Sequence, residues 1–259
     1  MDIVVCIKRV PLTQEVDLEI DAQKKDIKSD MLSYSINEWD NYAAEEAILL
    51  KEKTGGTVTA ISIGNEEVED VLRRALAMGA DRALRIDPGD RELDSFLRSK
   101  ILSKAIEDMD YDLIFTGVQS DDQNNGTTGS MLAERLGLAH ASVVNGIDPE
   151  GEGASIHIEL EGGIEEVSSI KLPALLTIQT GINEPRYVSI MGIRKASKKE
   201  LKVVTVEEIG LSGTDLEAMT TVEDLFLPPE TEGAEIIEGD ASFAAEEILR
   251  IMKEKGVNI

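Results

Sequence analysis

The stretch from Thr116 to Leu136 holds the residues best suited to binding a ligand. Its polar loop follows a short apolar run and leads into a pattern typical of a helix. The first backbone N–H groups of a helix lack partners within the helix, and its dipole favours negative charge there. Two glycines allow close backbone approach and three hydroxyls add donors: Gly126, Gly129, Thr127, Thr128 and Ser130. The loop is a candidate phosphate cradle, although an ordinary helix cap uses the same residue types.

Motifs for catalysis are missing from the sequence. It has no G-x-x-x-x-G-K-[ST] phosphate loop, no G-x-G-x-x-G after a predicted strand and no G-x-S-x-G nucleophile elbow. The adjacent Asp121 and Asp122 could be paired carboxylates or magnesium ligands, but turns favour aspartate for conformational reasons. We therefore predict no catalytic residue. With two histidines and no Cys/His cluster, we also predict no metal site.

The composition is that of an acidic globular protein. Of 259 residues 42% are hydrophobic, and the net charge is -25. Such a field repels nucleic acids and anionic membranes. No apolar run approaches the roughly 18 residues of a membrane span, and the start of the sequence lacks the signal-peptide pattern. Cys6 is the only cysteine, which favours a reducing compartment. We expect a cytoplasmic protein that neither binds nucleic acid nor inserts into membranes.

Strands and helices alternate along the first half of the chain. Buried strands are predicted at residues 3–7, 57–63, 83–86 and 113–115, and helices at 37–54, 66–78 and 93–109. This alternation predicts the α/β class, with right-handed crossovers and a mostly parallel sheet flanked by helices. Beyond Gly137, residues 154–160 and 164–170 predict a hairpin that adds antiparallel edge strands, and 175–178 predicts another buried strand.

Loops at the carboxyl ends of parallel strands form a common ligand crevice. Cys6–Arg9, the turn at Ile63-Gly64 and Gln119–Ser130 meet there by this rule. The helix start at Asn37–Asp40 could join them, with Asn37 capping the helix and Asp40 interacting with its dipole. Four loops at one edge predict a nucleotide-binding site, but residue chemistry alone does not identify a reaction.

The last third of the chain contains a basic segment and an extended arm. Five basic residues between Arg194 and Lys202 form either a solvated face or a contact surface. The neighbouring pair Ile190-Met191 is typical of a projecting contact loop. Residues 205–240 show no sustained period, and a helix with one apolar stripe is predicted at about 241–255.

Two domains are therefore expected. Residues 1–204 form the α/β domain, and residues 205–259 form an arm and a terminal helix. This helix could return to its own domain, but a helix on a long arm often packs on another subunit, which we expect here.

Five motifs spread over nearly the whole chain point to one family. They are Val4–Val10, Ala75–Arg82, Gly117-x-Gln119 with Thr128-Gly129-x-Met131, Asn183–Tyr187, and the basic segment Arg194–Val203. Together they resemble the beta subunit of electron transfer flavoprotein. The resemblance implies an adenine-nucleotide alpha-hydrolase-like fold and a heterodimer with an alpha subunit that shares an FAD. It further implies electron shuttling between flavin-dependent acyl-CoA dehydrogenases and another redox partner.

The resemblance also implies a structural AMP in this chain. Carried over by position, the contact residues lie on the four loops that the sheet rule selects: Cys6, Asn37, Glu38, Trp39, Asp40, Ile63, Gln119, Ser120, Asp121, Asp122, Gln123, Asn124, Asn125, Gly126, Thr127, Thr128, Gly129 and Ser130. Backbone contacts are expected at Cys6 and Ile63. Thr13, which replaces a tyrosine of some members, and Trp39 match positions that can approach the flavin of the alpha subunit.

The segment around Ile190 resembles the recognition loop of the family. Ile190 is expected to be the apolar anchor that docks on acyl-CoA dehydrogenase-type flavoenzymes, with Met191 beside it.

Two alternative functions stay open. Electron-bifurcating relatives place a second FAD where AMP otherwise sits, beside an NADH site, and Pro11 and Asp40 resemble those members. Thr128-Gly129-x-Met131 and Asn183–Tyr187 side with the AMP type, and the triplets Pro11-Leu12-Thr13 and Gln123-Asn124-Asn125 depart from the bifurcating pattern. The second alternative is a stand-alone adenine-nucleotide sensor or hydrolase.

Overall fold

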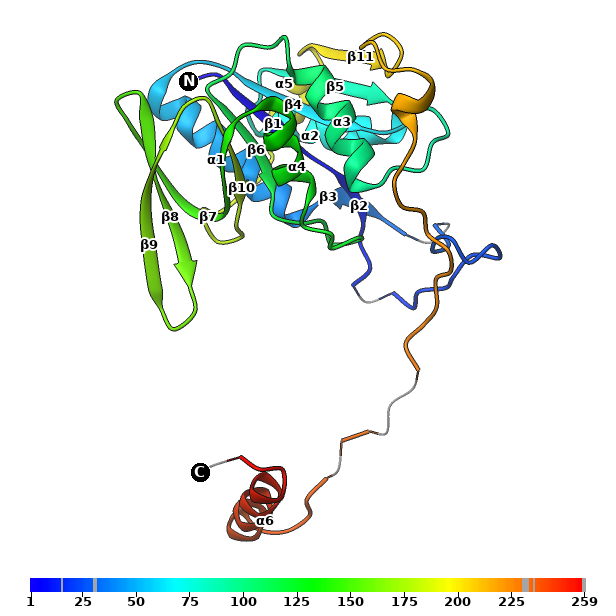
Figure 1. The fold of residues 1–259 in the computed structure, drawn as a ribbon, viewed down its shortest axis with the longest axis vertical. Coiled ribbons are helices and arrows are strands. Elements are labelled where there is room, and N and C mark those ends of the chain that lie inside the picture. Colours follow the sequence, from blue (N-terminus) through cyan, green and yellow to red (C-terminus); the bar gives the residue numbers. More distant parts are fainter. Residues whose placement is uncertain (15, 30–31, 230–232, 235, 258–259) are drawn as a thin grey trace. The chain divides into compact units, whose positions relative to one another are not determined.

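The computed structural model describes residues 1–14, 16–29, 32–229, 233–234 and 236–257. The chain divides into two compact units, Met1–Glu223 and Asp224–Ile259 (Figure 1).

A nine-stranded sheet forms the centre of the first unit. Its order is β11-β5-β4-β1-β6-β10-β7-β8-β9, and neighbours pair in parallel from β11 to β7 and antiparallel from β7 to β9. The strands are β1 (Ile3–Cys6), β4 (Val58–Ile63), β5 (Arg82–Asp87), β6 (Leu113–Gly117), β7 (Ala139–Glu150), β8 (Gly153–Leu160), β9 (Ile164–Lys171), β10 (Ala174–Ile178) and β11 (Leu201–Thr205). The predicted α/β class, with antiparallel strands at one edge, is confirmed.

Helices cover both faces of this sheet (Figure 1). They are α1 (Glu38–Thr54), α2 (Glu69–Met78), α3 (Ser95–Ile106), α4 (Thr128–Leu136) and α5 (Ile190–Ala196), with short 3-10 turns η1 (Glu66–Val68) and η2 (Gly213–Leu216). Alternate residues of β1 enter two separate cores: Ile3 and Val5 pack with α1 and α2, whereas Val4 and Cys6 pack with α3 and α4. The continuous apolar run at residues 3–7 follows from burial on both sides.

Some elements differ from the sequence prediction. The long strand β7 was not predicted because much of it is partly exposed and its pairing with β10 is irregular around Val143, whose φ is 62°. The basic segment contributes β11, an edge strand in which Lys202 and Val203 are exposed. The predicted contact loop at Ile190 is the start of helix α5, whose N-cap Ser189 accepts a hydrogen bond from the Gly192 amide.

A small antiparallel pair, β2 (Arg9–Pro11) and β3 (Tyr34–Ile36), leads the chain back to the start of α1. The Asn37 amide donates to the Lys8 carbonyl at 2.8 Å, so the ends of this pair place Asn37 next to the exit of β1.

The second unit contains helix α6 (Ala241–Glu254), close to the predicted 241–255. The arm was expected from residue 205, but Val206, Leu211 and Leu216 are buried in the core with α3 and α4. Residues 205–223 therefore belong to the first unit. None of the helices in the described ranges is long and apolar enough to cross a membrane.

The segment after β10 is fastened to α1 by the motif Asn183–Tyr187. The Arg186 Nε donates to Glu45 Oε1 at 2.9 Å, and its two terminal nitrogens donate to Glu52 at 2.8 and 3.1 Å. Glu45 is only 2% exposed. The Asn183 amide nitrogen donates to Glu46 at 2.9 Å. These bonds position α5, because α5 begins a few residues after Arg186.

Replacing Arg186 with methionine should destabilise the first unit. The change leaves the buried Glu45 carboxylate without its cation, which should lower the free energy of unfolding by about 3 kcal/mol. Urea denaturation measures this difference. Arg194→Met, at an exposed position of α5, is the matched control and should stay within about 0.5 kcal/mol of the parent protein. Equal effects of the two substitutions would contradict the anchoring role.

Candidate functional site

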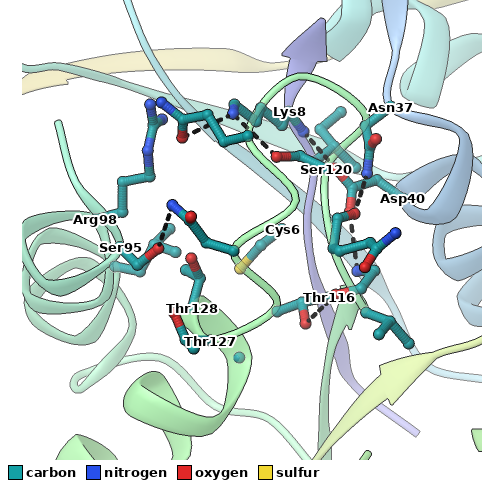
Figure 2. A pocket seen from close by; sticks show the side chains of 18 of the residues that line it. Cys6, Lys8, Asn37, Asp40, Ser95, Arg98, Thr116, Ser120, Thr127 and Thr128 are labelled. Atoms are coloured by element: carbon teal, nitrogen blue, oxygen red, sulfur yellow. Dashed lines mark hydrogen bonds between the residues drawn. The ribbon is translucent and has the colours of Figure 1, made fainter. Parts of the chain in front are cut away.

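A cavity lies at the carboxyl edge of the parallel strands. Its empty volume, which includes open solvent at the mouth, is about 710 Å³. In Figure 2, Lys8 and Ser120 lie on one side, Thr127 and Thr128 on the opposite side, and Cys6 between them. All four loops predicted to converge contribute residues to the walls.

The predicted site residues divide into two groups. Those that line the cavity are Cys6, Asn37, Asp40, Ile63, Gln119, Ser120, Gln123, Asn125, Gly126, Thr127, Thr128 and Gly129. The others lie on the same loops or helix starts outside the lining: Glu38, Trp39, Asp121, Asp122, Asn124 and Ser130.

Asn37 holds the loop before α4 rather than capping α1. It occupies the N-cap position, but its side chain makes no cap bond. Its amide nitrogen donates to the Gln119 carbonyl at 2.8 Å, and its oxygen accepts from the Asp121 amide at 3.0 Å. The capping prediction was therefore right about position and wrong about the role of the side chain.

Lys8 fastens the same loop from the other side and was missing from the predicted set. Its ammonium donates to Asp122 Oδ1 at 2.6 Å, Ser120 Oγ at 3.1 Å and Gln123 Oε1 at 3.2 Å. Burial and the nearby Arg98 lower the pKa of Lys8, whereas Asp122 raises it. The carboxyl-edge rule placed the Cys6–Arg9 loop at this crevice, but Lys8 itself was assigned no role because a basic residue after a strand is commonly a solvent-facing exit.

Asp121 and Asp122 do not act as a carboxylate pair. Asp122 is bound to Lys8, whereas Asp121 Oδ2 accepts from the Glu38 amide at 3.3 Å. The two side chains thus stabilise the loop toward different elements, as expected for turn residues.

Asp40 joins three elements at the base of the cavity. Its Oδ2 accepts from the Lys8 amide at 2.8 Å, and its Oδ1 accepts from the Gly117 amide at 2.9 Å. A Cβ at Gly117 would lie 2.5 Å from Asp40 Oδ1, so only glycine permits this contact. Burial raises the pKa of Asp40 to about 7, although both amides favour the ionised form.

The two glycines of the loop serve different purposes. Gly126 has a φ of +61°, a conformation that favours glycine. Gly129 was expected to admit a ligand, but a Cβ there would lie 2.6 Å from Thr177 Cγ2 and 2.7 Å from Thr116 Oγ1. Gly129 therefore allows α4 to approach the sheet. Thr127, the N-cap residue of α4, makes no side-chain cap bond, which leaves its hydroxyl free to meet a ligand.

Helix α3 supplies a wall that sequence reasoning missed. Ser95, Arg98 and Leu102 follow helical spacing and all line the cavity. Ser95 Oγ accepts from the Asn125 amide nitrogen at 3.3 Å. The Arg98 Nε is buried without a hydrogen-bond partner among the described residues. The sequence signal that could have identified this wall is the pair of polar residues Ser95 and Arg98, which lie close to the buried positions Leu97 and Ile101 of the helix.

Comparison with known proteins gives a consistent family. A family model for the electron transfer flavoprotein domain matches residues 28–209. The electron transfer flavoprotein subunit beta of Methylophilus methylotrophus is 38% identical over 262 residues, covering 98% of both chains. The same subunit from Bacillus subtilis is 36% identical over 257 residues, again with 98% of both chains covered. The human one is 31% identical over 258 residues, with 98% of this chain and 97% of its own covered.

The chain belongs to the electron transfer flavoprotein family, among its beta subunits. The predicted resemblance is confirmed. Membership in the electron transfer flavoprotein family implies an alpha-subunit partner and a flavin associated with the assembled heterodimer. Burial raises the pKa of the Cys6 thiol and so disfavours its thiolate form.

Asp40 gives the stability a pH dependence that an asparagine would lack. The folded pKa, about 7, lies above the ordinary value of 3.8, so the folded state binds an extra proton between these values. The contribution of Asp40 to stability is therefore greatest below pH 4 and decreases as the pH rises to about 7. Urea titrations at several pH values give the free energy of unfolding of the parent and of Asp40→Asn. The parent value minus the variant value should fall by up to about 4 kcal/mol as the pH rises from 4 to 7.

Because the other carboxylates are present in both proteins, their contributions to the pH dependence cancel in this difference. A difference that stayed constant from pH 4 to pH 7 would show that Asp40 keeps an ordinary pKa in the folded protein.

Proposed function

We propose that this chain holds AMP as a structural ligand within a heterodimer that shuttles electrons between acyl-CoA dehydrogenase-type flavoenzymes and another redox partner. The cavity at the carboxyl edge of the sheet is the observation on which the proposal rests. An FAD shared with the alpha subunit would supply the electron chemistry. This chain then needs no catalytic residue, and its own residues bind the nucleotide and the partners.

The lining of the cavity fits an adenylate. The amides at the start of α4 and the hydroxyls of Thr127 and Thr128 suit a phosphate. Ile61, Ile63 and Leu102 offer apolar surface to a base. Asn37 and Lys8 hold the loop in place through direct hydrogen bonds, so binding would require little ordering of the chain.

Two observations support our choice of AMP rather than a second FAD as the ligand of this cavity. FAD extends an adenylate by another phosphate, a ribityl chain and an isoalloxazine ring, and these need a path beside the loop. Lys8 and Asn37 fasten that loop at residues 119–123. Asp40, which resembles the bifurcating members, bonds to backbone amides, so its presence has a structural explanation.

Denaturing the purified heterodimer should release one AMP and one FAD per dimer. Chromatography and mass spectrometry of the released nucleotides measure this ratio. Two FAD per dimer would support the bifurcating alternative instead. Sustained ATP hydrolysis by the isolated chain would support the sensor or hydrolase and contradict a carrier subunit.

Helix α5 presents an apolar patch that suits transient docking. The patch consists of Tyr187, Ile190, Met191 and Ile193, of which Ile190 is 84% exposed. The basic residues Arg194 and Lys195 follow directly in the last turn. An exposed aliphatic anchor with a polar rim is the pattern of a small interface hot spot. We assign this patch to the docking of dehydrogenases.

Ile190→Ala should weaken electron delivery without loss of flavin. Removing a central interface anchor costs about 1–2 kcal/mol of binding, which corresponds to a roughly tenfold rise in the KM of a dehydrogenase for the flavoprotein. Steady-state reduction of the flavoprotein by a dehydrogenase measures this. Ile164→Ala, at a 61% exposed position of β9, is the matched control and should leave the KM unchanged. An unchanged KM for Ile190→Ala would exclude the docking role.

The second unit has the character of a partner-binding helix. No residue of α6 is buried, and Ala244, Ile248 and Ile251 share one apolar face at helical spacing. A helix of this length gains most of its stability by packing an apolar face. We assign that face to the alpha subunit.

A further inference from the structure

Arg98 is a cation of the cavity wall that no carboxylate neutralises. Its side chain extends from α3 along the side of the cavity between Ser95 and Lys8 (Figure 2). Within the described ranges it forms no ion pair within 4 Å, and its Nε is buried without a partner. Lys8, the other cation of the lining, is already bound to Asp122 at 2.6 Å.

The two carboxylates that influence Arg98 electrostatically, Asp94 and Asp122, form their hydrogen bonds with other groups. Asp94 accepts from the amides of Leu97, Met219 and Thr220 at 2.8–2.9 Å. Asp122 binds Lys8. Burial lowers the pKa of Arg98, and Asp122 and Asp94 oppose that shift. A guanidinium nevertheless stays protonated in proteins, so the charge persists inside the wall.

Removing a charged group from water without a partner is costly, and this holds for the buried Nε of Arg98, a residue that is otherwise partly exposed. The chain has 51 acidic residues and a net charge of -25, yet none of the described ones pairs with Arg98. An anion that enters the cavity would provide the missing counter-charge.

We propose that Arg98 is the counter-charge for the phosphate of the bound nucleotide and makes the cavity select a nucleoside monophosphate over the uncharged nucleoside. This inference rests on the proposed binding of an adenylate. Because Lys8 is neutralised by Asp122, the lining offers one uncompensated cation. A second or third phosphate would therefore lack a cationic partner, and ADP and ATP should bind more weakly than AMP.

The test compares AMP with adenosine on the nucleotide-depleted heterodimer by isothermal titration calorimetry. Arg98→Met should lower the affinity for AMP about 10- to 100-fold, the usual effect of a charge-assisted hydrogen bond. It should leave the affinity for adenosine unchanged. Arg98→Lys, which keeps the charge, should restore part of the AMP affinity, and the parent protein should bind ADP and ATP less tightly than AMP.

Arg135→Met is the matched control. Arg135 lies on α4, where its Nε donates to Ser99 Oγ at 2.9 Å and its guanidinium stacks on Phe96 at 4.3 Å, outside the cavity lining. This variant should keep the AMP-to-adenosine ratio of the parent protein. Thermal unfolding provides a second readout. Without nucleotide, Arg98→Met should melt at or above the temperature of the parent, and the rise in Tm on adding AMP should be smaller.

The outcomes separate this inference from the proposed function. Equal losses of AMP and adenosine affinity in Arg98→Met would assign Arg98 to the shape of the wall and overturn the proposal. So would a parent protein that binds adenosine as tightly as AMP. If Arg98→Met does not fold, Arg98→Gln provides the same comparison. A parent protein that binds neither compound, and releases no AMP on denaturation, would instead overturn the nucleotide site itself.

Discussion

One buried carboxylate connects the elements that surround the cavity. Asp40 belongs to the first turn of α1, yet it accepts hydrogen bonds from amides at the ends of β1 and β6. The glycine at residue 117 permits this contact because a side chain there would collide with the carboxylate. The position of the helix start, and with it Asn37, depends on this interaction. Asn37 and Lys8 then fix the loop before α4 through hydrogen bonds within the chain.

Charge within the cavity is arranged differently from charge on the surface. The surface is strongly acidic, whereas the lining combines Lys8 and Arg98 with Asp40. Lys8 forms an ion pair with Asp122, and Asp40 accepts hydrogen bonds from two backbone amides. Arg98 alone keeps an unsatisfied group among the described charges of the lining. A protein whose net charge repels anions at long range can therefore still offer a local site for an anion. Low-dielectric walls and fixed dipoles determine the potential inside such a site more than the net charge does.

The same fold separates the cavity from the exposed apolar residues of α5. Arg186 is held by Glu45 and Glu52 of α1, and this attachment places α5 with its exposed apolar residues outward. Glu45 is buried although it is charged, because Arg186 compensates it. Both functional regions therefore use α1 as a support, at its first turn for the cavity and at its later turns for α5.

Local patterns in the sequence were enough to predict the architecture and the four loops that line the cavity. Apolar runs at strand spacing, helical periods and the carboxyl-edge rule identified the parallel sheet and the four loops, since these signals are local. The family followed from motifs and was confirmed by the comparisons. Tertiary structure alone decided which side chains face the cavity. Lys8 binds Asp122, and Gly129 lies against Thr177, a residue far from it in the chain. The charge of Arg98 is influenced by Asp122 on another loop. No local sequence pattern specifies such contacts. Strands β7 and β11 escaped prediction for a related reason, because their pairing with neighbouring strands stabilises them more than their own apolar pattern does.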